Sequence, residues 1–193
     1  GQVELSCTPG THPLAPLMID FNAAREALPD CPLPAAPEYP GGRSRVEAHL
    51  VEARESHTRR FKQAPAGLWP AEGALSMPFL KQVAEAGFGW TASSQGVLRH
   101  SAGNDARTTV AWQAPEGIPG DITLFFRNEH LSDLIGFEYA KWHGRDAAQH
   151  FMTELKALHL QDDRNLIPVF LDGENAWEYY PYNGWYFFSD LYD

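Results

Sequence analysis

Short apolar runs alternate along this chain with longer stretches in which apolar residues recur every three to four positions. Runs of apolar and β-branched residues predict strands over 3–7, 67–69, 88–92, 122–127 and 166–171. The last run is almost continuously apolar, so we expect a strand that is buried on both faces of a sheet. Strands that alternate with helices predict a parallel sheet covered by helices, and therefore an α/β fold.

Helical spacing is clearest in the three segments 43–62, 76–87 and 147–158, and helical sequence also starts at about Leu131. The apolar face of the first segment comprises Val46, Leu50, Ala53 and Phe61, and that of the second comprises Phe79, Leu80, Val83 and Ala84. Ser76 is placed to cap the second helix, and Gly87 is placed to end it.

Chain length changes this picture from a complete barrel to a partial one. A closed β/α barrel takes about 250 residues, whereas this chain has 193 and opens within what looks like a strand. We therefore expect 1–193 to be part of a single barrel domain, truncated at one or both ends, with a Pro-rich loop at 28–42. A doubly wound open sheet is the alternative, but the Gly-rich dinucleotide fingerprint is absent.

Charge and composition narrow the classes of ligand. A net charge of −10 argues against nucleic-acid binding, which needs clustered Lys and Arg. No apolar run approaches the roughly 20 residues that cross a bilayer, so we expect no membrane partner and favour a cytoplasmic location. Two cysteines, Cys7 and Cys31, make neither a disulfide framework nor a zinc site, and no metal or other cofactor is expected. Acidity with 12% aromatic residues suits a neutral, polyhydroxylated ligand.

Two carboxylates stand where parallel α/β folds place their active sites, after the ends of strands. Glu72 follows the predicted strand at 67–69, and Asp172 follows the apolar run at 166–171. Each has a structural alternative, since Glu72 could stabilise a helix start and Asp172 could form an Asp-Gly turn. As a pair, beside aromatic residues such as Trp69 and Trp177, they suit cleavage of a glycosidic bond.

The strings around these residues resemble motifs of glycoside hydrolase family 57. The opening Gly-Gln-Val-Glu with Thr8-Pro9 and His12-Pro13 is similar to the second motif, 67–73 to the third, and 171–178 to the fourth. Residues 126–127 and 131–137 are similar to a stretch typical of one subgroup, so the resemblance covers nearly the whole chain. It implies a retaining enzyme that acts on α-glucans (starch, glycogen or maltooligosaccharides) on an incomplete (β/α)7 barrel of the glycoside hydrolase and deacetylase kind. In this resemblance Glu72 is the nucleophile and Asp172 is the general acid/base.

Some positions depart from the family pattern and leave subsite specificity open. The first motif, His-Gln-Pro, and a fifth, more C-terminal motif have no counterpart in this chain. Gly10-Thr11 stand where two aromatic residues usually precede the histidine, Ser93-Ser94-Gln95 stand in place of acidic residues, and Asn128-Glu129-His130 replaces an Asp-His pair.

Further residues are candidates for binding the sugar, namely His12, Trp69, Arg127, His130, Glu174 and Trp177. Three have structural alternatives: His12 could be packed among prolines, Arg127 could pair with Asp133, and Trp177 could belong to the core. Glu4 could orient His12 or a substrate hydroxyl, or form a structural ion pair.

Two other functions remain open. A metal-dependent polysaccharide deacetylase on a related barrel would need an Asp and two His around one metal, and His12 with His130 is the plausible converging pair. A non-catalytic glycan-binding pseudo-enzyme would keep the scaffold alone. For the favoured retaining reaction, the two carboxyl groups should lie about 5–5.5 Å apart. Hydrolysis, transfer and branching are not separable from the sequence, and neither is the oligomeric state.

Overall fold

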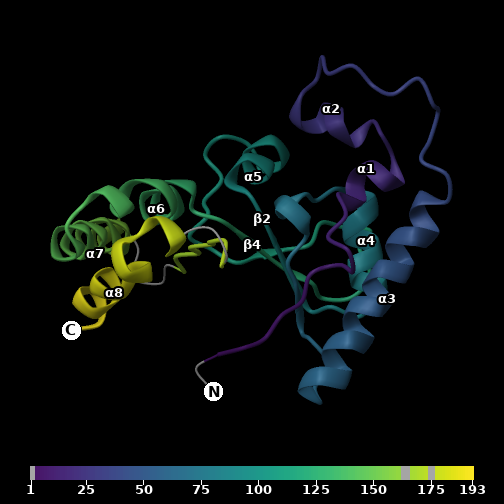
Figure 1. Cartoon of the computed structure of the whole chain (residues 1–193). Helices are drawn as coiled ribbons and strands as arrows, with labels where there is room; N and C mark the ends of the chain where they lie inside the picture. Colours follow the sequence, from purple (N-terminus) through teal and green to yellow (C-terminus); the bar gives the residue numbers. More distant parts are fainter. Residues whose placement is uncertain (1–2, 162–165, 174–176) are drawn as a thin grey trace. The chain divides into compact units, whose positions relative to one another are not determined.

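The computed structural model describes residues 3–161, 166–173 and 177–193, and the side chains of 160–161 are not described. The chain forms two compact units, the first made of Gly1–Ala106 with Ala111–Phe126 and the second of Arg107–Val110 with Arg127–Asp193 (Figure 1). Strands and helices both occur, so the predicted α/β class is confirmed. The incomplete barrel and the single catalytic domain over 1–193 stay predictions.

The first unit is built on a four-stranded mixed sheet. Its strands are β1 (Gly67–Leu68), β2 (Trp90–Ser93), β3 (Trp112–Gln113) and β4 (Thr123–Phe126), in the order β1-β2-β4-β3. The β1–β2 and β2–β4 pairs are parallel, as predicted, whereas β3 runs antiparallel to β4. The strand predicted over 3–7 is reduced to one parallel bridge, from Cys7 to Leu68 beside β1.

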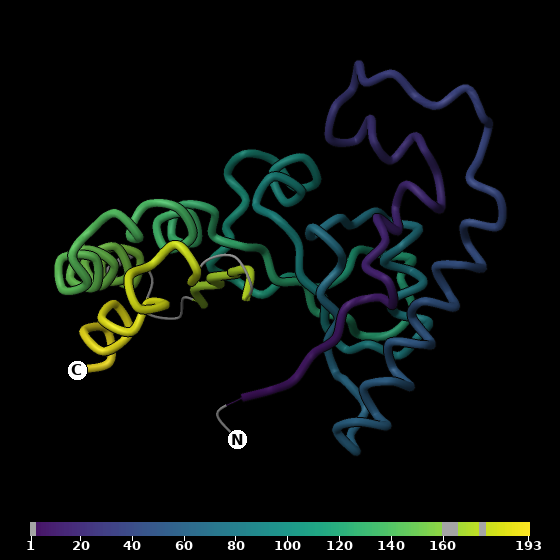
Figure 2. Tube along the Cα trace, in the orientation of Figure 1, coloured from purple at the N-terminus to yellow at the C-terminus, as the bar shows by residue number. Residues whose placement is uncertain are grey.

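The helices of the first unit are α1 (Ala15–Ile19), α2 (Ala23–Ala27), α3 (Gly42–Phe61), α4 (Met77–Glu85) and α5 (Gln95–Ala102). Helix α1 packs against both α3 and α4, and α2 packs against α5. Between α2 and α3 the chain crosses a long connection, residues 28–41, that contains no helix or strand (Figure 2).

The predicted helix at 43–62 is α3, and its face is correct except at one end. Val46, Leu50 and Ala53 are buried, whereas Phe61, at the end of the same face, is 54% exposed. The buried position that continues the face is His57, because it lies four residues after Ala53 and therefore one turn further along the same side. The Phe61 ring instead contacts the His57 ring at 4.8 Å.

The predicted helix at 76–87 is α4, with Phe79, Leu80 and Val83 buried. Ser76 does occupy the N-cap position, but its side chain makes no capping hydrogen bond, so that part of the prediction was wrong. A capping hydroxyl accepts from the N–H of the second or third helical residue, and the second residue here, Pro78, has no N–H.

The second unit is mainly helical. It contains α6 (Glu129–Asp133), the π-helical turn η2 (Leu134–Glu138), the 3-10 turn η3 (Tyr139–Lys141), α7 (Gly144–Gln161), two more 3-10 turns, η4 (Trp177–Tyr179) and η5 (Pro181–Gly184), and α8 (Trp185–Tyr192). Helices α7 and α8 pack on each other. The core joins Leu131, Ile135, Tyr139, Ala147, Ala148, Phe151, Tyr180 and Phe187. Burial raises the pKa of Tyr180, whose hydroxyl donates to the carbonyl of Ile135.

The apolar run at 166–171 is not a strand, so the prediction of a strand there was wrong. Its backbone bonds to α6 and the N-cap residue of that helix, because Asn128 N–H donates to the Pro168 carbonyl (2.8 Å) and Phe170 N–H donates to the Ser132 hydroxyl (3.2 Å). Leu166 N–H donates to the Thr109 carbonyl (3.1 Å), and the run belongs to no β-ladder among the described residues. Leu166 and Leu171 are 42% and 37% exposed, so it is not buried on both faces either.

Both cysteines are free thiols, as the sequence predicted. Burial raises the pKa of Cys7 to about 11, so this thiol is protonated at neutral pH.

Lys62 offers a test of backbone strain at the end of α3. It adopts the left-handed conformation (φ 61°, ψ 13°), which costs a non-glycine residue roughly 1 kcal/mol. Lys62→Gly should therefore raise the free energy of unfolding by about 0.5–1 kcal/mol, measured by urea denaturation. Lys62→Ala serves as the control and should give no gain. A glycine variant no more stable than the alanine variant would contradict the assignment of strain.

Candidate active site

Glu72 lies on a tight turn just after β1. The turn is η1 (Ala71–Gly73), and Glu72 in its middle is left-handed, with φ 56° and ψ 18°. Its side chain is 77% exposed. Helix α4 starts five residues later, at Met77, so the alternative role of stabilising a helix start is not supported, because that effect fades within one turn. A non-glycine residue held at positive φ requires anchoring by its surroundings, and such strain clusters at functional sites.

Three contacts hold this turn in place. The Ser93 hydroxyl, at the end of β2, donates to the Gly73 carbonyl (2.5 Å). Trp69 N–H donates to the Cys7 carbonyl (2.8 Å), which fixes the chain entering the turn. The half-buried Trp69 ring packs under the turn, so that a Cβ at Gly73 would lie only 3.3 Å from it. Gly73 also has positive φ (65°), so glycine suits this position both for its backbone conformation and for the lack of space for a side chain.

His12 faces Glu72. Its Nε2 lies 3.6 Å from Glu72 Oε1, and its Nδ1 lies 3.2 Å from the Thr8 hydroxyl. Thr11 and His12 are both left-handed (φ 60° and 55°), so the histidine and the carboxylate that meet here both sit on strained backbone. One ring nitrogen of His12 therefore lies beside the Thr8 hydroxyl and the other lies beside the Glu72 carboxylate. His12 is therefore not simply packed among prolines.

Glu4 has a partner that the sequence did not indicate, and its role in orienting a substrate hydroxyl stays a prediction. Its carboxylate accepts a hydrogen bond from the indole N–H of Trp90 (2.7 Å). The two serines that departed from the family pattern also have structural roles. Ser93 anchors the turn of Glu72, and Ser94 caps α5 by accepting from Val97 N–H (3.1 Å). Sequence reasoning missed the anchoring role of Ser93, for which a small hydroxyl residue at a strand end was the one available clue.

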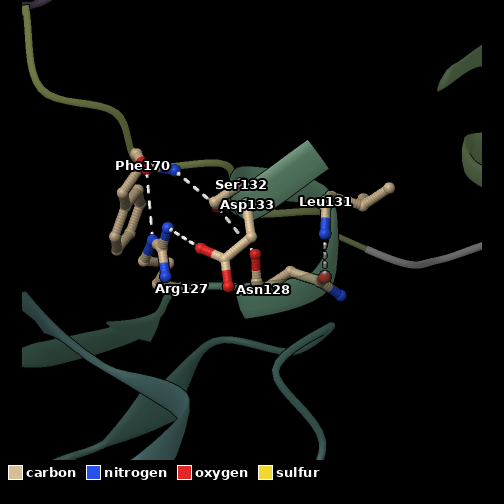
Figure 3. A network of polar contacts seen from close by, with 6 residues as sticks. All are labelled: Arg127, Asn128, Leu131, Ser132, Asp133 and Phe170. Carbon is tan, nitrogen blue, oxygen red and sulfur yellow. Dashed lines mark hydrogen bonds and ion pairs between the residues drawn. The ribbon is translucent and has the colours of Figure 1, made fainter. Parts of the chain in front are cut away.

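In the second unit, Arg127 belongs to a network of polar contacts (Figure 3). Its Nη2 lies 2.6 Å from Asp133, and its Nε donates to the Phe170 carbonyl (3.2 Å). The Ser132 hydroxyl donates to the Asn128 carbonyl and accepts from Phe170 N–H. The ion pair with Asp133, one of the two roles considered for Arg127, is therefore present. Together these bonds hold the backbone two residues before Asp172, whose side chain is exposed.

The other predicted sugar ligands of this unit make contacts within it. His130 Nε2 lies 3.0 Å from Glu154, whose carboxylate is also 3.8 Å from His150. His150 in turn contacts the hydroxyl of buried Tyr139 at 2.8 Å, and burial raises the pKa of Tyr139 to about 12. Within the described ranges, no group of three or more His, Cys, Asp or Glu side chains is arranged to hold a metal ion.

Trp177 packs as a core residue would. Its half-buried ring lies 4.6 Å from Phe188 and 5.4 Å from Tyr180, and a Cβ at Gly184 would approach it to 3.0 Å. Its role as a sugar platform stays a prediction, as do the sugar-binding roles of His12, Trp69, Arg127 and His130. Glu174 lies outside the described residues. The pairing of Glu72, in the first unit, with Asp172, in the second, also stays a prediction.

Comparison with known protein families identifies the chain at the level of its family. It is of the glycoside hydrolase class, and it belongs to glycosyl hydrolase family 57, whose model matches residues 1–193. No curated protein sequence matches it at a significant level. No helix among the described residues is long and apolar enough to cross a membrane.

Three solved structures share the fold, two of them described as branching enzymes of family 57. They include a branching enzyme from the hyperthermophilic archaeon Pyrococcus horikoshii (14% identity, TM-score 0.68) and one from Thermococcus kodakaraensis (13%, 0.69). A third is a 4-alpha-glucanotransferase from Thermococcus litoralis (17%, 0.63). The matches cover 99%, 99% and 100% of this chain but only 41%, 44% and 25% of those chains, respectively. The chain therefore spans less than half the length of these structures.

Arg127 should contribute more to stability than an ordinary surface ion pair. Because its side chain is only 23% exposed and bonds to both Asp133 and Phe170, we expect Arg127→Met to lower the free energy of unfolding by about 1–2 kcal/mol. The exposed Lys141–Glu138 pair provides a control, and Lys141→Met should change stability by about 0.5 kcal/mol or less. Denaturant unfolding of both variants measures these changes. Equal losses of unfolding free energy would show that the network around Arg127 adds no stability beyond that of a surface ion pair.

Proposed function

We propose that the protein containing this chain is a retaining α-glucan-active glycosidase or transglycosidase. Glu72 acts as its nucleophile and Asp172 as its general acid/base. The observation that carries the proposal is the exposed Glu72 carboxylate on a strained, anchored turn at the end of a parallel strand, with His12 facing it at 3.6 Å. Membership of glycosyl hydrolase family 57 supports it.

In the first step, a Glu72 oxygen attacks the anomeric carbon of the sugar and forms a glycosyl-enzyme ester. The bond to the leaving oxygen breaks as Asp172 donates its proton to that oxygen. Glu72 attacks as the carboxylate, and the His12 ring lies 3.6 Å from one of its oxygens, where it can help to orient the carboxylate. The Thr8 hydroxyl keeps the imidazole turned toward Glu72.

In the second step, Asp172, now a carboxylate, takes a proton from an incoming hydroxyl group. The oxygen of that group attacks the anomeric carbon and releases Glu72, so the configuration of the sugar is retained. When the incoming group is water the outcome is hydrolysis, and when it is a sugar hydroxyl the outcome is transfer or branching. The names of the structural neighbours, branching enzymes and a glucanotransferase, favour an α-glucan as both donor and acceptor.

The product profile on a defined maltooligosaccharide tests this function. Products that are only shorter indicate a hydrolase, longer products indicate a transferase, and new branch points indicate a branching enzyme. The newly formed anomer, followed by proton NMR at early times, should keep the α configuration. Release of acetate from an acetylated polysaccharide, with no action on maltooligosaccharides, would show the alternative deacetylase. No change in either substrate, with measurable glycan binding, would show a pseudo-enzyme.

A further inference from the structure

Strand β2 sends two buried hydroxyl groups to the chain around Glu72. Thr91 and Ser93 are both 0% exposed, and as alternate residues of one strand they lie on the same face of the sheet. The Thr91 hydroxyl donates to the carbonyl of Leu68 (2.8 Å), in β1 before the turn. The Ser93 hydroxyl donates to the carbonyl of Gly73 (2.5 Å), the residue directly after Glu72. Only the second bond reaches the turn itself.

The two bonds differ in what they hold. Leu68 already pairs with Thr91 in the parallel ladder between β1 and β2, so the sheet fixes its position without the hydroxyl. Gly73 belongs to no strand, and both it and Glu72 have positive φ (65° and 56°). A left-handed conformation is unfavourable for a residue with a side chain, so Glu72 keeps it only with support from its surroundings. The bond from Ser93 supplies that support at the next residue.

The direction of the Glu72 carboxylate depends on this backbone. Its side chain is 77% exposed, so protein packing around the side chain does little to orient it. The turn itself lies close against its neighbours, since a Cβ at Gly73 would be 3.3 Å from the Trp69 ring and 3.5 Å from the Ser94 nitrogen. A reacting group that is displaced by about 1 Å can lose roughly 10²-fold in rate. A bond that fixes this turn can therefore affect the rate of attack.

We propose that Ser93 is a positioning residue for the nucleophile. Its hydroxyl holds the backbone after Glu72, so that the carboxylate points at the anomeric carbon of the bound sugar. The inference rests on the proposed function, in which Glu72 attacks that carbon. Because Ser93 is fully buried, it acts through Glu72 and not by contact with the substrate.

Steady-state kinetics of the protein that contains this chain, on a defined maltooligosaccharide, test the proposal. Ser93→Ala should lower kcat about ten- to hundred-fold and change KM by less than about two-fold, because it leaves the substrate contacts in place. Thr91→Val is the matched control, since it removes a second buried hydroxyl bond of β2 that does not reach the turn. Its kcat should stay within about two-fold of the parent value. Each variant should lower the midpoint of thermal unfolding by a similar amount, roughly 2–4 °C.

A double-mutant cycle shows whether Ser93 acts through Glu72. In Glu72→Gly, azide added to the solution can replace the missing carboxylate as the nucleophile, and the turn does not hold azide. Adding Ser93→Ala to Glu72→Gly should therefore change the azide-dependent rate by less than about two-fold. A hydroxyl that only stabilises the fold would lower the rate by the same factor in both backgrounds.

Thermal unfolding of each variant is measured before the rates are compared. Ser93→Cys, whose thiol is only a weak donor, should also lower kcat and provides the test if Ser93→Ala does not fold. The proposal is overturned if removal of the Ser93 hydroxyl leaves kcat within about two-fold of the parent value, if Thr91→Val loses as much, or if Ser93→Ala slows the azide reaction as much as the parent reaction. Failure of the proposed function has a different signature, because Glu72→Gly would then stay active without azide.

Discussion

Replacing Glu72 by glycine should abolish turnover of α-glucans and at the same time make the chain more stable. In the proposed mechanism Glu72 forms the covalent intermediate, so we expect its removal to lower activity by about 10⁴-fold or more. The stability gain follows from the left-handed backbone (φ 56°, ψ 18°), which glycine adopts without strain, and should be about 1 kcal/mol. Activity is measured on maltooligosaccharides and stability by urea unfolding.

Two matched variants separate the backbone effect from the carboxylate effect. Lys62→Gly removes the same kind of strain (φ 61°) at the end of α3, outside the turn of Glu72, so it should stabilise the protein and leave activity unchanged. Glu72→Gln keeps a side chain at the strained position but cannot attack the sugar, so it should be inactive without a gain in stability. A Glu72→Gly variant that keeps about a tenth or more of the parent activity would show that Glu72 is not the nucleophile.

Chemical rescue tests the role of Glu72 more directly. The space left by the side chain in Glu72→Gly can admit azide, which attacks the anomeric carbon from the same face. The product should be a β-glycosyl azide, inverted relative to the α-linked substrate, and NMR of the product identifies the anomer. Stimulation of Glu72→Gly by azide with formation of the β-azide supports the nucleophile. An α-azide, or none, would contradict it.

The helical parts of this fold were predictable because their pattern is local. Val46, Leu50 and Ala53 recur at helical spacing, and α3 buries all three of them. Phe61 lies on the same face but is exposed, because spacing alone does not tell whether the neighbouring element extends far enough to cover a side chain at the helix end. At that end His57 is the last buried residue of the face, and it was not chosen because histidine is not apolar.

The errors elsewhere were of a different kind, because they depend on partners distant in sequence. The run 166–171 is rich in strand-forming residues, but a strand also needs another strand beside it. Here the partners are Thr109, in a turn, and Asn128 and Ser132, in α6 and at its N-cap. Serine is a common N-cap residue, but Pro78, two residues after Ser76, lacks the N–H group from which the Ser76 hydroxyl would accept a hydrogen bond. Local composition therefore limits which structures a segment can form, and its partners in the fold determine which of them it adopts.

In the candidate site, too, local features were predictable and features that depend on distant residues were not. The type and order of Glu72, Asp172 and their flanking strings are present in the sequence, which is why the family could be predicted and its model matches 1–193. The left-handed turn at Glu72 could not be predicted, since it depends on Ser93, 21 residues further along the chain, and on the packing of Trp69 beneath Gly73. The contact between His12 and Glu72 likewise joins two loops that are distant in sequence.

Asp172→Ala should lose most of its activity on natural α-glucans and much less on substrates whose leaving group needs no proton. General acid/base catalysis contributes about 10²–10⁴-fold, so we expect a loss of that size with maltooligosaccharides. Fluoride departs without protonation, so formation of the glycosyl-enzyme from α-maltosyl fluoride should be nearly unaffected. Pre-steady-state release of fluoride measures this step, and Glu72→Gln should abolish it.

The second step of the reaction gives the decisive evidence for Asp172. Without a base to activate water, the glycosyl-enzyme of Asp172→Ala should accumulate, and turnover of the fluoride should slow after an initial burst. Azide needs no base, and it enters from the face that water would use, so it should restore turnover and give an α-glycosyl azide. This is the opposite anomer to the one expected from Glu72→Gly. The two variants therefore assign the two carboxylates to opposite faces of the sugar, as a retaining mechanism requires. The division of roles between Glu72 and Asp172 would be wrong if both variants gave the same azide anomer. Arg127→Met, which leaves Asp172 in place, serves as a control. The division would also be wrong if this variant lost the fluoride burst in the same way as Glu72→Gln.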